Sequence, residues 1–144
     1  EEQGSWEEEQ AQQIDELLAY VDEKAGTTPA IIMGDMNTGP AGASFVGEVP
    51  ANYAKFVKAG LHSPYVERAA AQCTFCQTNP LVAGAADDSQ SVVIDHVLLR
   101  SFAGVAMAER VLDQPIQVET CGKPIAAAYS DHYGVMVSLS WPSE

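Results

Sequence analysis

The sequence predicts an α/β (α+β) fold in which an outer helix covers a twisted mixed sheet of mostly antiparallel strands. Three patterns lead to this prediction. Residues 5–25 carry apolar side chains at helical spacing, residues 29–34 form a short apolar run that ends in glycine, and every second residue of 133–141 is apolar. The 144 residues allow a single domain.

The first helix is expected over residues 5–25. Ser5 is a suitable N-cap, and Glu8 follows at the spacing of a capping box. The glutamates at 7–9 lie in the first turn, where carboxylates interact favourably with the helix dipole, so the acidic run is a solvated helix start. Gly26 is a natural C-terminal stop. One apolar stripe is formed by Ile14, Leu17, Leu18 and Val21.

The later elements follow from shorter patterns. A strand at 29–34 leads to a turn, and a short helix over 52–59 is expected to end at Gly60. Residues 63–90 are rich in turn-forming residues and predict a surface connection, whose unusual length indicates a functional or restrained segment. The remaining strands are expected at 91–100, 104–112 and 133–141.

Polar residues capable of chemistry follow or interrupt the expected strands. Asp35 and Asn37 come directly after the strand at 29–34, and Asp95 interrupts an apolar run. Asp131 and His132 immediately precede the last strand. Catalytic groups in α/β folds usually lie where strands emerge at the edge of a sheet. Packing alone does not account for three such clusters in one small chain.

These clusters resemble the motifs of the endonuclease/exonuclease/phosphatase superfamily, the deoxyribonuclease-I-like metal-dependent phosphoesterases. That family carries a Gly-Asp-x-Asn motif, then an Ile-Asp-x-Val/Phe-Leu strand, then a Ser-Asp-His motif. Each motif alone is common, but the three in order span most of the chain. They are matched by Gly34-Asp35-Met36-Asn37, Ile94-Asp95-His96-Val97-Leu98 and Ser130-Asp131-His132.

The resemblance implies a four-layer α/β-β/α sandwich of which this chain supplies a part. In the family, the first half of the domain contributes an early Asn, a metal-binding Glu and a phosphate-contacting Tyr or His. No counterpart of those strands precedes residue 34. We therefore expect residues 1–144 to be the C-terminal portion of a single domain, inactive alone although the intact parent is an enzyme. The alternative is a non-catalytic fragment or a binding or structural module that retains the fold.

The resemblance also implies roles in phosphodiester hydrolysis assisted by Mg²⁺ or Mn²⁺. Asp35 corresponds to the general base that activates water, and Asn37 to an amide that contacts a phosphoryl oxygen or holds the nucleophile in line. His132 corresponds to the imidazole that bonds the scissile phosphate, and Asp95 to the carboxylate that orients it. Asp131 corresponds to an acid that binds the metal directly or through water.

Each role has a structural competitor. Asp35 and Asn37 could form only an Asx-type turn after the strand. A buried Asp95 needs a partner, and His132 is the best candidate. His96 has the opposite strand parity from Asp95 and is expected to be structural. His62 is expected at the surface. Thr38 fits either turn stabilisation or a phosphate contact.

The cysteines predict a small disulfide. Cys73 and Cys76 form a Cys-x-x-Cys motif in the long connection, a pattern typical of a disulfide in an acidic, secreted chain. Zinc is disfavoured because three cysteines lack a fourth ligand at suitable spacing. A thioredoxin-like role is disfavoured because the motif does not open a helix after a strand. Cys121 is left free, paired with this loop, or paired with a cysteine outside the chain.

Charge and hydropathy restrict the partners. A net charge of −13, from 20 acidic against 7 basic residues, disfavours tight binding to a nucleic-acid backbone. Bound divalent cations can offset that charge, so a nuclease is not excluded. The expected substrate is a phosphodiester, in nucleic acid or a phospholipid headgroup, and the motif contexts look slightly more like nuclease- and sphingomyelinase-like members than inositol phosphatases.

Location and assembly are also expected from the sequence. No segment approaches the ~20 apolar residues of a membrane span, and the acidic, cysteine-containing chain suggests an extracellular or periplasmic location. A single sheet lacking its facing sheet would expose an apolar surface, which predicts self-association.

Overall fold

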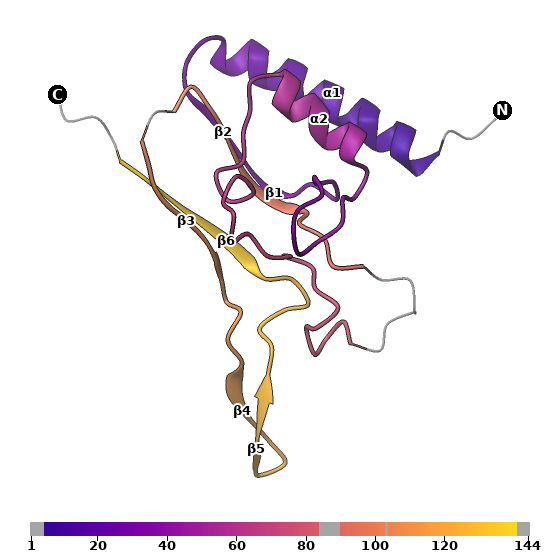
Figure 1. Cartoon of the computed structure of the whole chain (residues 1–144), viewed down its shortest axis with the longest axis vertical. Helices are drawn as coiled ribbons and strands as arrows, with labels where there is room; N and C mark the ends of the chain where they lie inside the picture. The colour runs from indigo at the N-terminus through magenta and orange to yellow at the C-terminus, as the bar shows by residue number, and fades with distance from the viewer. Residues whose placement is uncertain (1–4, 84–89, 103, 141–144) are drawn as a thin grey trace.

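The computed structural model of the chain describes residues 5–83, 90–102 and 104–140. Within these residues the helices and strands follow one another in an α+β order, shown in Figure 1. They are α1 (Trp6–Ala25), β1 (Ala30–Asp35), α2 (Pro50–Lys58), β2 (Asp95–Arg100), β3 (Val105–Val111), β4 (Ile116–Thr120), β5 (Lys123–Ala127) and β6 (Gly134–Leu139).

Helix α1 begins and ends as its sequence predicts. The backbone N–H of Ser5 donates to Oε2 of Glu8 at 3.0 Å, and the N–H of Glu8 donates to Oγ of Ser5 at 3.3 Å. This reciprocal pair is a capping box, in which side chains bond backbone N–H groups at the start of the helix. Gly26 ends the helix with a φ of 55°, a conformation that glycine adopts readily.

Strands β1 and β2 pair antiparallel, and both helices cover one face of this pair (Figure 1). The register places Ile31 opposite Leu99, Met33 opposite Val97 and Asp35 opposite Asp95. Between the strands and the helices lies a hydrophobic core whose buried members come from all four elements and the segment after α2: Ile14, Ile32, Tyr53, Phe56, Leu61 and Leu98.

Strands β3 and β6 form a second antiparallel pair, and β6 also contacts β2. A second core lies against this pair, built from Phe45, Tyr65, Ala71, Cys73, Cys76, Val93, Ala108 and Tyr133. The strand pairs named within the described residues are all antiparallel, and they form two-stranded sheets. The α+β class is therefore confirmed.

The hairpin of β4 and β5 was not predicted. It extends away from the two cores (Figure 1) and turns at Cys121 and Gly122, which both have positive φ angles. Its strands are short and mostly exposed, so they lack a strong apolar pattern. The alternation of Ile116 and Val118 with polar residues is the signal that could have indicated it.

The prediction of a surface connection after residue 62 was wrong for the described part, residues 63–83. This segment is restrained, as its length indicated, but much of it is buried among the cores. Its buried residues are Ser63, Pro64, Tyr65, Ala71, Cys73, Thr74, Cys76, Asn79 and Val82. Internal hydrogen bonds satisfy polar groups that are buried in this segment. The hydroxyl of Tyr65, for example, donates to the carbonyl of Gln72 at 2.7 Å and accepts from the N–H of Gln72 at 2.9 Å.

Candidate active site

The end of β1 and the start of β2 bring two carboxylates face to face. Asp35 is the last residue of β1, Asp95 is the first residue of β2, and the two are direct partners in the antiparallel register. Directly opposed residues of a strand pair point to the same face of the sheet. Like charges in this arrangement repel, so a neighbouring positive charge stabilises the pair.

His132 brings an imidazole to these carboxylates from the loop before β6. Its Nδ1 lies 2.9 Å from Oδ2 of Asp95, and the two side chains are 27% and 20% exposed. Because an ionised carboxylate can only accept, Nδ1 carries the proton and donates to Asp95. This leaves Nε2 for another partner. The expected pairing of Asp95 with His132 is confirmed.

The electrostatic surroundings favour the charged form of His132. Burial lowers the pKa of the imidazole, but the hydrogen bond and the negative charge of Asp95 raise it. The charges of Asp35 and Asp131 raise the pKa further, so that it lies above the ordinary value of a histidine. An imidazolium at this position offsets the repulsion between the two facing carboxylates.

The same three residues form a group able to hold a cation. One ligand atom from each of Asp35, Asp95 and His132 lies within 4.8 Å of the others. Carboxylate oxygens suit Mg²⁺ and Mn²⁺, and Mg²⁺ is commonly bound by one or two carboxylates while it keeps several waters. The two carboxylates therefore fit part of the coordination shell of a hard divalent cation, whereas His132 could be a ligand only as the neutral ring.

Asn37 lies on a tight turn after β1. Its backbone N–H donates to Oδ1 of Asp35 at 2.9 Å, so the Asx-type turn considered from the sequence is present. The turn is braced by Gln10 of α1, whose Nε2 donates to the carbonyl of Asn37 at 2.8 Å and to that of Met36 at 3.3 Å. Gln10 could not be found from the sequence, because its role depends on the packing of α1 against the turn.

A cavity of about 500 Å³ opens beside His132. Both polar and apolar residues line it, and its size lies in the range of small-molecule sites. The ring of Phe75, one of the lining residues, lies 5.1 Å from that of His132, centroid to centroid. The lining residues are Asn37, Glu48, Phe75, Gln90, Val92, Ile94 and His132.

Asp131 is adjacent to His132 but outside the three-residue group among the described residues. Its side chain is exposed and accepts a hydrogen bond from Oγ of Ser130 at 3.0 Å. Oγ of Ser130 in turn accepts from the backbone N–H of His132 at 3.2 Å, which orders the loop. The carboxylate of Asp131 acts on His132 through its charge.

His96 has the structural role expected from its strand parity. Burial lowers its pKa, which favours the neutral ring. Its Nε2–H donates to the carbonyl of Thr38 at 2.9 Å, and Nδ1 is 3.4 Å from Oγ of Ser63. The ring also lies 5.1 Å from that of Tyr53. A satisfied, buried imidazole of this kind is not exposed to substrate.

Thr38 and His62 also lie away from the chemistry. The buried hydroxyl of Thr38 donates to the carbonyls of Glu48 at 3.0 Å and Val49 at 2.8 Å, so Thr38 stabilises the turn. The Nδ1 of His62 lies 3.2 Å from Oε1 of Glu67 in a partly exposed pair. His62 is therefore a surface residue, as expected.

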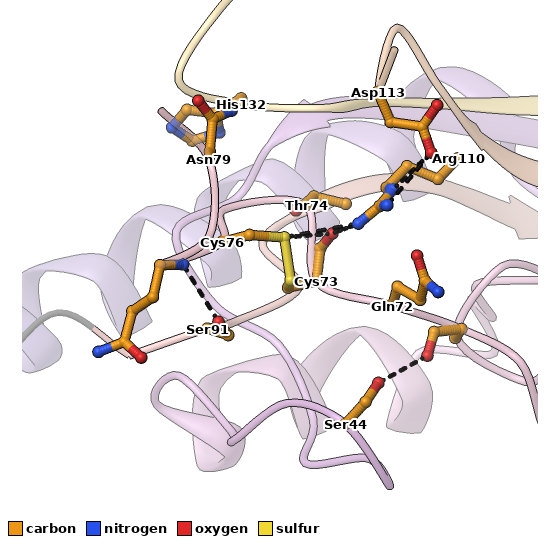
Figure 2. Close-up of a disulfide and its surroundings, with 12 residues drawn as sticks. Ser44, Gln72, Cys73, Thr74, Cys76, Asn79, Ser91, Arg110, Asp113 and His132 are labelled. Atoms are coloured by element: carbon orange, nitrogen blue, oxygen red, sulfur yellow. Dashed lines mark hydrogen bonds and ion pairs between the residues drawn. A yellow bond between two sulfur atoms is a disulfide. The ribbon is translucent and has the colours of Figure 1, made fainter. Parts of the chain in front are cut away.

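The predicted disulfide is present. Cys73 and Cys76 are bonded, with Cα atoms 5.4 Å apart, and both are buried (Figure 2). Cys121 is free and exposed at the tip of the β4–β5 hairpin, so it does not pair with the loop of Cys73 and Cys76.

Two buried residues of the disulfide segment support the site and were missed from the sequence. Oγ1 of Thr74 accepts hydrogen bonds from the backbone of Asp95 and the residue before it. Nδ2 of Asn79 donates to the carbonyl of Ser130 at 2.9 Å and to that of Asp131 at 3.1 Å. Both lie in the segment interpreted as a surface connection, so nothing in the sequence pattern marked them.

The chain matches no protein-family model and no curated protein.

None of the helices within the described residues has the length and apolar character needed to cross a bilayer.

Proposed function

We propose that the chain is the C-terminal portion of a metal-dependent phosphoesterase domain that hydrolyses a phosphodiester. The observation that carries the proposal is the meeting of Asp35, Asp95 and His132, which come from three separate parts of the sequence. Two facing carboxylates repel each other and lower the stability of the fold, so their presence beside a hydrogen-bonded imidazole indicates a functional site. A bound cation would interact favourably with the carboxylates, and an anionic phosphate with the imidazole.

The residues divide the chemistry between them. Asp35, exposed at the end of β1, accepts a proton from the attacking water as its oxygen bonds to phosphorus. The bond from phosphorus to the alcohol oxygen breaks, and the departing oxygen takes a proton from solvent. His132, oriented by Asp95 through Nδ1, presents Nε2–H to a phosphoryl oxygen and stabilises the charge that develops there. The Asn37 amide, which lines the same cavity, donates to a second oxygen. A Mg²⁺ or Mn²⁺ ion held by carboxylates at this edge, Asp131 among them, supplies further positive charge when it is bound.

The proposal extends to architecture and location. Under this proposal, the two helices and the β1–β2 pair correspond to the layers on one side of the four-layer sandwich. The disulfide is typical of an oxidising compartment and supports an extracellular or periplasmic location. The substrate class remains a nucleic-acid or phospholipid phosphodiester, with the nuclease- and sphingomyelinase-like members as the first candidates.

We also propose that the chain self-associates through the bare face of β1. Strand parity places Ile31, Met33 and Asp35 on the face opposite the helices. The side chain of Met33 is 68% exposed and that of Ile31 is 42% exposed. Adjacent exposed apolar residues on a sheet face favour burial against another surface.

The test of the catalytic proposal is Mg²⁺-dependent hydrolysis of bis-p-nitrophenyl phosphate. The 144-residue chain is expected to be nearly inactive, and a longer chain that includes the preceding half of the domain is expected to be active. In that longer chain, Asp35→Asn and His132→Ala should each lower the rate by at least about 10²-fold. His62→Ala is the matched control and should leave the rate unchanged. Wild-type rates in both site variants would show that the module is non-catalytic.

A further inference from the structure

We propose that Thr74, held inside the Cys73–Cys76 disulfide loop, is a positioning residue that sets Asp95 and His132 against each other. The effect of Thr74 on the Asp95–His132 hydrogen bond is inferred from geometry alone. The effect of Thr74 on the rate of hydrolysis rests on the proposed function. Asp95 begins β2 and His132 lies 37 positions later, in the loop before β6, and these two strands belong to different strand pairs. Some part of the fold must therefore fix the two segments relative to each other.

The side chain of Thr74 fixes the segment that carries Asp95. Its Oγ1 accepts from the backbone N–H of Ile94 at 3.1 Å and from that of Asp95 at 3.2 Å. Asp95 is the first residue of β2, so this hydroxyl holds the point at which the strand begins. The threonine is fully buried, so its hydroxyl is shielded from solvent.

The backbone of Thr74 fixes the segment that carries His132. Its carbonyl accepts from the N–H of Tyr133 at 2.8 Å, directly after His132. The next residue, Phe75, pairs with His132 in an isolated antiparallel bridge and places its ring 5.1 Å from the imidazole. One residue thus contacts the backbone on both sides of the Asp95–His132 hydrogen bond.

The disulfide and Arg110 restrain the loop that carries Thr74, and Figure 2 shows Thr74 beside both. The bond between Cys73 and Cys76 closes a short loop around Thr74. Nη1 of Arg110 donates to the carbonyl of Cys73 at 3.0 Å, and its guanidinium lies 4.5 Å from the ring centroid of Tyr133. The loop is therefore tied to β3 on one side and to the site on the other.

A merely structural Thr74 and a positioning Thr74 differ in their response to two substitutions. Thr74→Val keeps the shape and removes the hydroxyl acceptor, whereas Thr74→Ser keeps the acceptor and removes a methyl group. If Thr74 only fills space, valine is the milder change. If it positions Asp95, serine is the milder change, because only valine removes the acceptor of the N–H groups of Ile94 and Asp95.

The first experiment uses the 144-residue chain and needs no activity. An imidazole N–H bonded to a carboxylate gives a far-downfield proton resonance, which is assigned to His132 by its loss in His132→Gln. We expect Thr74→Val to abolish or broaden this resonance and Thr74→Ser to retain it. Retention in both variants, with the fold intact, would overturn the proposal.

A second experiment decides the matter if Thr74→Val does not fold. In Cys73→Ser/Cys76→Ser, the backbone amides of Asp95 and Tyr133 should exchange with solvent faster, relative to the wild type, than the amides of the β3–β6 ladder. An equal change in both sets would mean that the loop contributes only global stability and would refute a positioning role.

The kinetic arm uses the longer chain that the proposed function expects to be active. Thr74→Val should lower kcat by about 10- to 10²-fold, the scale of a small misplacement of catalytic groups, with KM unchanged and with rescue by Thr74→Ser. Changes of equal size in KM and kcat in Thr74→Val would argue against a positioning role for Thr74. If the longer chain shows no hydrolysis at all, the proposed function fails, whereas the resonance and the amide exchange still test the role of Thr74.

Discussion

Asp35 and Asp95 face each other across the β1–β2 ladder, as the last residue of one strand and the first residue of the next. Like charges directly opposite in a strand pair destabilise it, by an amount within the roughly 0.2–1 kcal/mol of such cross-strand pairs. The protein tolerates this cost next to an imidazole that carries the opposite charge. Arrangements that lower stability without a structural benefit are typical of functional sites.

The first prediction concerns this repulsion. Asp35→Asn removes one of the two facing charges while its Oδ1 can still accept from the N–H of Asn37. Without added metal, and at a pH above the raised pKa of His132, where the imidazole is neutral, the free energy of unfolding should therefore rise, by up to about 1 kcal/mol. Urea denaturation measures the change, with Glu119→Gln on the exposed face of β4 as the control. A loss of stability in Asp35→Asn would show that the carboxylate is structural.

The second prediction concerns the charge of His132. Asp95 raises the pKa of its imidazole, so an NMR titration should give a value above the usual ~6.5. Asp95→Asn should lower that pKa, because both the charge and the charged hydrogen bond are lost. The raised pKa stabilises the fold fully below about pH 6.5, and this contribution disappears as the pH rises through the folded-state pKa. An unchanged pKa in Asp95→Asn would contradict the electrostatic explanation.

The third prediction concerns His96 and has the opposite sign. Burial lowers the pKa of this imidazole, so below about pH 6.5 the unfolded state binds more protons than the folded state. Its contribution to stability is complete above that pH and is lost as the pH falls toward the folded-state pKa. Denaturation series in His96→Gln should show a weaker fall in stability between neutral and acidic pH than the wild type. Parallel curves would mean that His96 is not the titrating group.

The sequence predicts those parts of the fold that depend on neighbouring residues. Helix α1 follows from its cap at Ser5, its apolar stripe and its stop at Gly26, all of which are local signals. The boundaries of β1 differ by one residue from the expected range 29–34. The hydrogen bond between Asp95 and His132 also follows, because a carboxylate inside an apolar strand requires a partner.

Other features depend on contacts between distant segments. The opposition of Asp35 and Asp95 results from the register of two strands that are far apart in the sequence. The burial of Thr74 and Asn79 depends on backbone groups of β2 and of the loop before β6 that satisfy their polar atoms. Turn-forming residues predict an exposed segment, and such reciprocal hydrogen bonds leave no pattern in the sequence.

The fourth prediction concerns the core beneath the helices. Phe56 of α2 is fully buried among residues of α1, β1 and β2, so Phe56→Ala should lower the free energy of unfolding by about 3–5 kcal/mol. Its neighbour Val57 is 53% exposed, and Val57→Ala should change stability by no more than about 0.5 kcal/mol. Thermal or urea unfolding of the two variants measures the contrast. Equal effects would mean that α2 does not pack on the strands as described.

The last prediction concerns the bare face of β1, where Met33 is 68% exposed beside Asp35 on the side that the helices leave uncovered. If this face associates with another copy, Met33→Lys should shift the protein toward monomer, because a lysine charge is costly to bury in an apolar contact. Light scattering over a range of concentrations reports the mass of each species. Val57→Lys introduces the same charge on the exposed face of α2 and should leave the mass distribution unchanged. A wild-type chain that is monomeric at every concentration, or an equal response to both lysines, would rule out association through β1.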